Sequence, residues 1–292
     1  MKRLENKKIA ILGTSPIMIL LYFRLKKKNL VDVYEHLKIG GAWRIDKYKE
    51  KYYSAHNNVI VALNDNEEKY IELINKELAS FGCKKTKSKG EYKLISDYIP
   101  KKKYIHDLSN LYLNFKENCN SLKKKKITSV KACSNKIYLN NAKYDQVFFP
   151  SCFNVNKISI NNSNFNVKPT KSISHHLTIV YKKTKLPNIS YTENFDNVFD
   201  RAYFRKNRKY IFFTGRIRRN YKKLQSSQLI KISNLLQNTT KNIIKIKKNR
   251  YCHNIIKEDN LRDLKLRLNQ TKLSIVETKQ FVKSYKLLNK LK

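Results

Sequence analysis

The stretch that decides the fold of this chain is Lys8–Arg44, which reads KIAILGTSPIMILLYFRLKKKNLVDVYEHLKIGGAWR. It begins with a short apolar run, Ile9–Leu12, which is typical of a buried parallel strand and ends at Gly13. An apolar stretch of helical length, Pro16–Leu25, follows, and a second apolar run, Leu30–Tyr34, closes on an acidic residue. Strand, tight turn, helix, strand and acid in this order predict a βαβ unit of the dinucleotide-binding type.

The glycine fingerprint of such a unit is only partly present. Gly13 supplies the sharp turn out of the strand, but Ser15 stands where a second glycine lets the backbone approach a pyrophosphate. Met18 stands where a third glycine lets helix and strand pack closely. Glu35 follows Gly13 by about 20 residues, the spacing at which a carboxylate bonds a ribose hydroxyl.

A glycine pair, Gly40-Gly41, follows the acid, and its backbone amides could face a phosphate, to which Arg44 could add a charge-assisted hydrogen bond. The run Ile9–Arg44 resembles the FAD-binding start of the flavoprotein superfamily that includes amine oxidases, flavin monooxygenases and UDP-galactopyranose mutase. The resemblance implies that the acid binds the adenosine ribose and that the glycine pair borders the pyrophosphate and the flavin. The cofactor-binding residues that it implies here are Gly13, Ser15, Pro16, Glu35, Gly40, Gly41, Trp43 and Arg44.

Two further stretches resemble the same superfamily. Tyr52–Leu63 is predicted to be a turn that runs into a strand. Its His56 resembles a histidine that lies near the flavin in the mutase group. A loop histidine with no functional role is an equal alternative. Downstream, Ile127–Val130 opens a set of three short predicted strands with polar turns, the last of them Gln146–Pro150. This set resembles the antiparallel excursion from which these flavoproteins return to the nucleotide sheet, with Val130 where the backbone meets the adenine; a generic β-meander is the alternative.

The stretch Lys209–Leu236 loosely resembles the closing segment of UDP-galactopyranose mutase. The resemblance implies that Gly215 and Arg216 contact FAD and that Arg201 and Tyr221 hold the substrate. Lysines follow Tyr221 where the family has further tyrosines.

The composition indicates a globular chain with a large excess of positive charge. Its 292 residues are 41% hydrophobic, and 63 Lys and Arg against 22 Asp and Glu give a net charge of +41. Such charge favours an anionic partner, such as nucleic acid, a membrane surface or a phosphorylated substrate. The lysines are spread over the whole length, however, so nucleic-acid binding is less favoured than a solvated basic surface.

Cysteine and histidine spacing predicts no disulfide framework and no metal site. The five cysteines show no C-x-x-C pair, which is typical of reduced thiols in the cytoplasm. A basic start before an apolar run could also indicate a signal peptide or membrane anchor, but Gly13–Pro16 breaks the run before it reaches the roughly 20 residues of a membrane span. We therefore expect a cytoplasmic protein without a transmembrane segment.

The predicted fold class is α/β, with a Rossmann-like FAD-binding domain built from discontinuous segments and a small α+β substrate region inserted. The nucleotide domain is expected to comprise 1–45, 122–160 and 205–236, the substrate or cap region 46–121 and 161–204, and a lysine-rich, helical extension 237–292.

The predicted function is that of an FAD-dependent oxidoreductase or flavin-dependent mutase, in which NAD(P)H could serve as reductant. Its substrate is expected to be small and polar, either an anion or a sugar nucleotide. His56, Arg201 and Tyr221 are the candidate catalytic residues. The alternatives are a catalytically dead nucleotide-binding relative and a basic protein that binds nucleic acid or a membrane surface.

Overall fold

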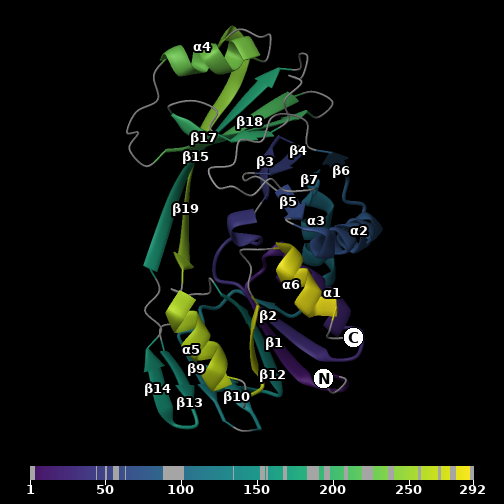
Figure 1. Ribbon diagram of the computed structural model, residues 1–292, viewed down its shortest axis with the longest axis vertical. Helices are drawn as coiled ribbons and strands as arrows, with labels where there is room; N and C mark the ends of the chain where they lie inside the picture. The colour runs from purple at the N-terminus through teal and green to yellow at the C-terminus, as the bar shows by residue number, and fades with distance from the viewer. Residues whose placement is uncertain are drawn as a thin grey trace.

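The computed structural model describes residues 4–43, 45–49, 51–54, 59–62, 64–87, 102–133, 135–151, 155, 157–166, 170–182, 191–193, 198–206, 210–218, 226–235, 240–255, 258–268, 271–276 and 281–289. A parallel sheet with its helices forms one end of the molecule, and an antiparallel sheet forms the other. Two long strands, β15 (Thr170–Lys182) and β19 (Ile243–Ile255), run between the two ends (Figure 1).

The parallel sheet has the strand order β20-β12-β1-β2-β8. Its strands are β1 (Lys8–Leu12), β2 (Leu30–Tyr34), β8 (Leu122–Lys123), β12 (Gln146–Pro150) and β20 (Leu273–Val276). β1 lies in the centre, with β2 on one side and β12 on the other, and every pairing is parallel. In open α/β sheets, ligands bind outside the carboxyl ends of the strands at such a switch of strand order, so the residues after β1 occupy the expected position of a ligand site.

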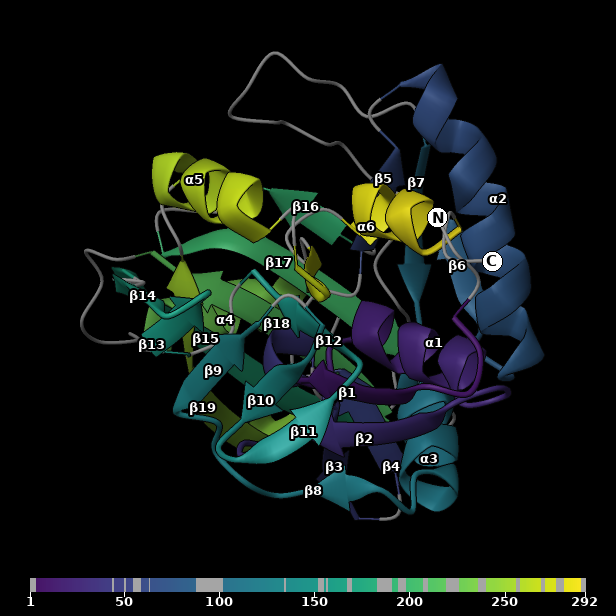
Figure 2. The ribbon, with the colours of Figure 1, turned by 90° about the horizontal axis from the view of Figure 1, so that it is seen from below.

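Both faces of this sheet are buried, which explains the uninterrupted apolar run of β1. Ile9 and Ile11 pack into the core formed with the helices, whereas Ala10 and Leu12 pack into a second core on the other face. The helices of the first core are α1 (Pro16–Leu25), α2 (Asp65–Ser80), α3 (Ser109–Asn118) and α6 (Phe281–Asn289). Figure 2 shows α1 lying along β1 and β2. The N-terminal apolar run is therefore buried in this fold as β1 and α1.

A second sheet, of order β11-β10-β9-β13-β14, covers the other face. Its strands are β9 (Ser129–Ala132), β10 (Ile137–Leu139), β11 (Ala142–Tyr144), β13 (Lys157–Ile160) and β14 (Ser163–Asn166), and α5 (Glu258–Leu268) buries Leu264 and Leu268 against it. After β11 the chain returns to the parallel sheet through β12, which pairs with β1, and it then leaves again to form β13 and β14. The predicted excursion and return strand are confirmed.

The sheet at the far end has the order β16-β17-β18-β15-β19. The remaining strands of this sheet are β16 (Tyr191–Glu193), β17 (Phe199–Lys206) and β18 (Tyr210–Ile217), and α4 (Ser226–Leu235) packs on them through Ile232. Smaller elements are β3 (Ile45–Tyr48), β4 (Lys51–Ser54), β5 (Val59–Ala62), β6 (Lys85–Lys87), β7 (Lys102–His106), η1 (Gly41–Trp43) and η2 (Thr240–Asn242). An ion pair of 2.8 Å between Lys247 Nζ and the buried Asp46 joins β19 to β3.

The arrangement confirms the α/β class, but two segments lie elsewhere than expected. Residues 205–236 were assigned to the nucleotide domain, yet their strand β18 pairs with β15 and β17 in the antiparallel sheet. Residues 237–292, expected to be a helical extension, do contain α5 and α6, but they also contribute the long strand β19 and the edge strand β20 of the parallel sheet. Several lysines lie among the apolar residues of β19, and they are largely solvent-exposed in the structure. The apolar alternation that would predict a strand is therefore weak in this part of the sequence.

Over the part of the chain that the structure describes, no helix has both the length and the apolar character that a bilayer span requires.

Candidate cofactor site

The turn between β1 and α1 has the backbone geometry of a nucleotide-binding turn. Gly13 adopts a positive φ of 86°, which favours glycine, and its N–H donates a hydrogen bond of 2.7 Å to the carbonyl oxygen of Tyr34 at the end of β2. Ser15 is the N-cap residue of α1 and Pro16 its first residue. The turn therefore places the positive end of the α1 dipole beside the carboxyl ends of β1 and β2.

Glu35 is the acidic residue at this edge, and it is 6% exposed. Its Oε2 accepts hydrogen bonds from the Thr14 N–H at 3.1 Å and from the Thr14 hydroxyl at 2.8 Å. Its Oε1 accepts one hydrogen bond, from the Leu37 N–H at 3.0 Å. The carboxylate is thus fixed at the end of β2, as a ribose ligand requires.

The glycine pair completes the cluster. The Gly40 N–H donates a hydrogen bond of 2.8 Å to the Thr14 hydroxyl, so one side chain joins the β1–α1 turn to this loop. Gly40 and Gly41 have φ values of 94° and 53°, and no atom lies within 4 Å of a Cβ built on Gly41. The backbone at Gly41 is therefore open to a ligand.

The departures from the glycine fingerprint are accommodated without loss of the helix. Ser15 has an extended backbone (φ −61°, ψ 157°) that any residue can adopt, and Met18 is buried in the core with the helices. The Ser15 hydroxyl oxygen is buried and has no hydrogen-bond partner among the described residues. Such an orphaned oxygen beside a helix start is a position where a ligand would supply the missing partner.

A partly buried polar cluster holds β2, the strand that ends just before Glu35, on the side of the second sheet. The Tyr144 hydroxyl lies 2.7 Å from that of Tyr34 and 2.6 Å from Asp32 Oδ2, which Lys123 also contacts at 2.6 Å. Burial, followed by the hydrogen bond to Asp32, raises the pKa of Tyr144 above its usual value. These contacts hold β2 rigidly behind the carboxylate.

Two of the other residues implied to contact the cofactor, Trp43 and Val130, pack into the hydrophobic cores. Trp43 contacts Phe281 of α6 in a tilted arrangement, with ring centroids 5.8 Å apart, and packs against the core formed with the helices. Val130 is 2% exposed on β9, where it pairs with Leu139 and Ile158. Arg44 lies outside the described residues.

Gly215 and Arg216 lie on β18, in the antiparallel sheet. A Cβ on Gly215 would meet Cδ1 of Phe199 at 2.5 Å, so close packing alone requires glycine there. The register pairs Arg216 with Arg201 of β17, so the two arginines are neighbours across the strands. His56 and Tyr221 lie outside the described residues.

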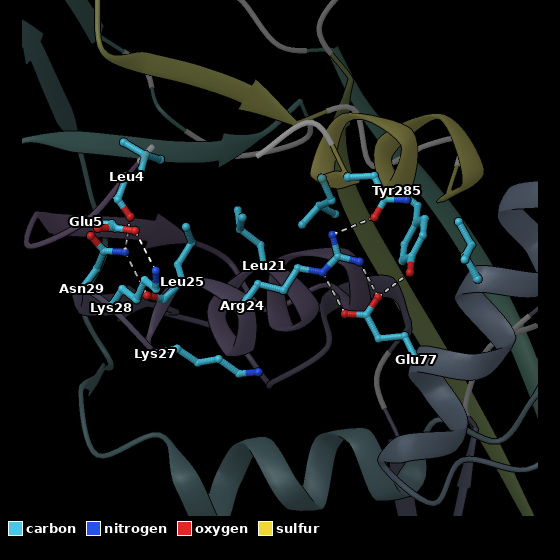
Figure 3. Close-up of a pocket in the computed structure, with 13 residues that line it drawn as sticks. Leu4, Glu5, Leu21, Arg24, Leu25, Lys27, Lys28, Asn29, Glu77 and Tyr285 are labelled. Carbon is cyan, nitrogen blue, oxygen red and sulfur yellow. Dashed lines mark hydrogen bonds and ion pairs between the residues drawn. The ribbon is translucent and has the colours of Figure 1, made fainter. Parts of the chain in front are cut away.

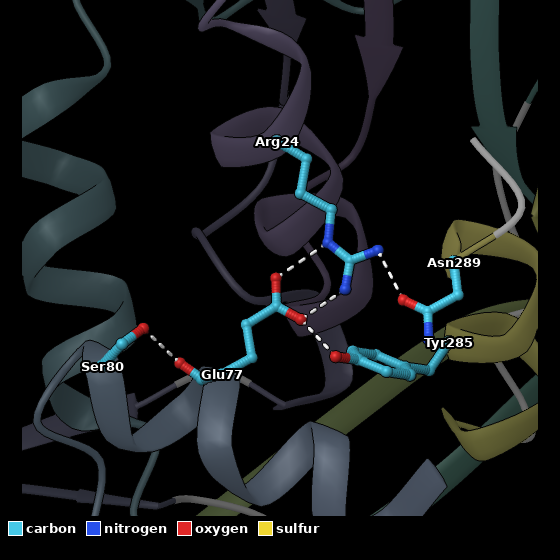
Figure 4. Close-up of polar contacts among 5 residues, drawn as sticks. All are labelled: Arg24, Glu77, Ser80, Tyr285 and Asn289. Atoms are coloured by element: carbon cyan, nitrogen blue, oxygen red, sulfur yellow. Dashed lines mark hydrogen bonds and ion pairs between the residues drawn. The ribbon is translucent and has the colours of Figure 1, made fainter. Parts of the chain in front are cut away.

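A pocket of about 480 Å³ lies at the opposite end of α1, among residues of α1, α2 and α6 (Figure 3). At its wall Arg24 binds Glu77 through two hydrogen bonds, of 2.8 Å and 2.5 Å, and Glu77 also accepts one of 2.5 Å from the Tyr285 hydroxyl (Figure 4). Arg24 also donates a hydrogen bond to Asn289 at 3.1 Å. These contacts fasten three helices together, away from the Gly13 turn.

Sequence reasoning missed Thr14, which contacts Glu35 and Gly40 at once. The available signal was a hydroxyl residue directly after the first glycine of the fingerprint. A hydroxyl can donate to one group and accept from another, so this residue type can join two loops.

No protein-family model matches the sequence, and no curated protein matches it. The fold, in contrast, matches solved structures over nearly its whole length. Wild-type putrescine oxidase bound to putrescine superposes with a TM-score of 0.62 at 8% identity, covering 99% of this chain and 98% of that one. An FAD-dependent oxidoreductase from Pseudomonas aeruginosa gives 0.58 at 9% identity, covering 100% and 90% of the two chains. A fatty acid isomerase from P. acnes gives 0.56 at 8% identity, covering 99% of each.

At such low identity the likeness is one of fold, and it agrees with the resemblance that Ile9–Arg44 carries in the sequence. The chain has the Rossmann-type fold of the FAD-binding flavoproteins.

Proposed function

We propose that this chain binds FAD at the carboxyl edge of the parallel sheet and acts as a flavin-dependent enzyme. The observation that supports this most is the cluster of Thr14, Glu35 and Gly40 beside the start of α1. It joins an acid at the end of β2, a glycine turn after β1 and an open glycine backbone at one edge of the sheet.

The residues present fit the two polar parts of the adenosine diphosphate half. Among the described residues, Oε1 of Glu35 accepts one hydrogen bond, from the Leu37 N–H, so a lone pair remains for a ribose hydroxyl. The start of α1 and the open backbone at Gly41 suit a pyrophosphate, although Pro16 offers no N–H to it. When bound, FAD supplies the redox centre that takes hydride from a C–N or C–O bond or, once reduced, acts as nucleophile at a sugar carbon.

For the substrate, we propose a small anion, of which a sugar nucleotide is one example. The paired strand positions of Arg201 and Arg216 suit a phosphate or carboxylate, and the net charge of +41 disfavours a diamine such as the putrescine bound to the oxidase of similar fold. His56, Arg201 and Tyr221 are the proposed catalytic and substrate-binding residues, and NAD(P)H is a proposed reductant.

The test is the visible spectrum of the purified protein before and after titration with FAD. We expect flavin absorption bands, FAD released on denaturation, and at least a tenfold weaker affinity in Glu35→Gln, because the ribose loses its hydrogen bond to a charged acceptor. Glu72→Gln, on the exposed side of α2, is the matched control and should bind FAD like the wild type. A colourless protein that shows no saturable binding of FAD would refute the proposal.

A second candidate is a nucleotide-binding relative that has lost catalysis, favoured by Ser15, Pro16 and Met18 in the fingerprint. Such a protein would be colourless as purified yet bind ADP in a manner that depends on Glu35. A basic nucleic-acid or membrane-surface binder would instead bind anionic polymers with a steep dependence on salt, unaffected by Glu35→Gln. A panel of UDP-sugars, putrescine and NAD(P)H, read by thermal shift and by bleaching of the flavin, separates the substrate and reductant proposals.

A further inference from the structure

We infer that Thr14 is the positioning residue of the proposed FAD site, holding the Glu35 carboxylate and the Gly40 amide in the geometry that the cofactor needs. The inference rests on the proposed function and adds a residue that the glycine fingerprint does not assign. Thr14 is 1% exposed, so its hydroxyl exchanges no hydrogen bonds with bulk water.

The polarity of the Thr14 hydroxyl is fixed by its two neighbours. The Gly40 N–H can only donate, so the hydroxyl oxygen accepts this bond of 2.8 Å, and its own proton goes to Oε2 of Glu35 at 2.8 Å. Oε2 of Glu35 therefore accepts from both the hydroxyl and the N–H of Thr14, while Oε1 accepts from the Leu37 N–H. Glu35 can then offer its remaining lone pair only to a donor such as a ribose hydroxyl.

Thr14 also acts mechanically. It lies in the turn after β1, Glu35 lies after β2, and Gly40 lies in the following loop, so its two hydroxyl bonds fix three segments relative to one another. Without the hydroxyl, the Thr14 N–H is the one donor to Oε2 that remains among the described residues, and the buried Gly40 N–H loses the Thr14 acceptor. The loop would then have to be ordered by the ligand at the expense of affinity.

Thr14→Val tests this role because it keeps the branched shape and removes only the hydroxyl. We expect the FAD dissociation constant to rise about tenfold to a hundredfold, the range for a lost hydrogen bond to a charged group. In the apo protein, the Gly40 amide should exchange with deuterium faster. Thr14→Ser keeps the hydroxyl and should restore both properties to near wild-type values.

The matched control is Thr178→Val, because the Thr178 hydroxyl is also buried but has no partner among the described residues and lies in the antiparallel sheet. It should leave FAD affinity and Gly40 exchange unchanged. If Thr14 acts partly through Glu35, Thr14→Val should weaken FAD binding less in a Glu35→Ala background than in the wild type, because only the bond to the Gly40 amide is then left to lose. If Thr14→Val does not fold, Thr14→Ala removes the same hydroxyl and is compared in the same way.

Two results would overturn the inference while leaving FAD binding intact. One is a hydroxyl-free variant that binds FAD as tightly as the wild type. The other is an equal loss of affinity with and without Glu35. If the wild type itself binds no FAD, the proposed function fails, and the exchange of the Gly40 amide then decides whether the Thr14 bridge exists in the apo protein.

Discussion

A methyl group added at Gly215 has no room in the core of the antiparallel sheet. A Cβ there would lie 2.5 Å from Cδ1 and 2.9 Å from Cε1 of Phe199, and 2.9 Å from Cζ of Phe213. Carbon atoms pack at about 3.5–4.0 Å, so the Phe199 ring would have to move by about 1 Å. Both rings are fully buried and touch edge to face, with centroids 5.4 Å apart, so neither can move freely.

We therefore expect Gly215→Ala to lower the free energy of unfolding by about 2–3 kcal/mol, the upper part of the range for an overpacked core. For a chain of 292 residues, 2 kcal/mol corresponds to a decrease in Tm of about 3 °C. Urea denaturation followed by tyrosine fluorescence and by circular dichroism would measure it. Phe199→Leu makes room, so the double variant should be more stable than the sum of the two single effects predicts.

Gly41→Ala is the matched control, since its Cβ would meet nothing within 4 Å and its φ of 53° is the only obstacle. We expect a loss of about 1 kcal/mol from the left-handed backbone alone. Unchanged stability of Gly215→Ala would refute the packing argument. Unchanged stability together with a clear loss of FAD affinity would instead support the cofactor contact that the sequence resemblance implied for Gly215.

Three further perturbations test the electrostatics and the burial of individual side chains in this structure. Glu77→Gln should lower the free energy of unfolding by about 1–3 kcal/mol, because it weakens the hydrogen bonds from Arg24 and Tyr285 and leaves the guanidinium without its counter-charge. Urea titration measures this free energy. An unchanged urea midpoint would mean that the three helices do not need this contact. Burial and the hydrogen bond to Asp32 raise the pKa of Tyr144 above 10.0, so its contribution to stability is complete below pH about 10 and is lost as the pH rises through the raised value. Tyr144→Phe should therefore lose stability less steeply above pH about 10, and equal slopes for the two proteins would contradict the burial of this phenol. Burial raises the pKa of the Cys83 thiol to about 11, so about one thiol in a thousand is ionised at pH 8. Alkylation of Cys83 in the native protein should therefore be roughly a hundredfold slower than in the urea-unfolded chain. Mass spectrometry of the labelled peptide measures the two rates, and equal rates would contradict the burial of this thiol.

Much of the parallel sheet and its first helix could be predicted from local patterns. β1, α1 and β2 follow from apolar runs of the right lengths around Gly13, because a strand buried on both faces needs continuous apolar residues. The position of Glu35 near the Gly13 turn could be predicted from its spacing to that glycine in the sequence, and its carboxylate does lie beside the turn.

The remaining features depend on contacts between distant segments. Thr14 bridges two loops that meet only after the sheet has formed, so its role has no local pattern. Gly215 looks like a glycine that admits a cofactor, and only the position of Phe199 reveals a second reason for it. β20 is four residues long and becomes a strand only by pairing with β12, which no period in its own sequence predicts.

The parallel sheet has a strong kinetic consequence. Ile9 pairs with Gln146, and Val147 pairs with Leu273, so the strands that flank the Gly13 turn come from widely separated parts of the chain. Such a high contact order slows folding, since long loops must close before the pairing is gained. During synthesis the ribosome would release β1 and α1 long before β12 exists to cover them, and these apolar segments would have to be kept from aggregating in the meantime. We therefore expect refolding from denaturant to be slow, to be limited by the docking of β12 and β20, and to give better yields at low protein concentration.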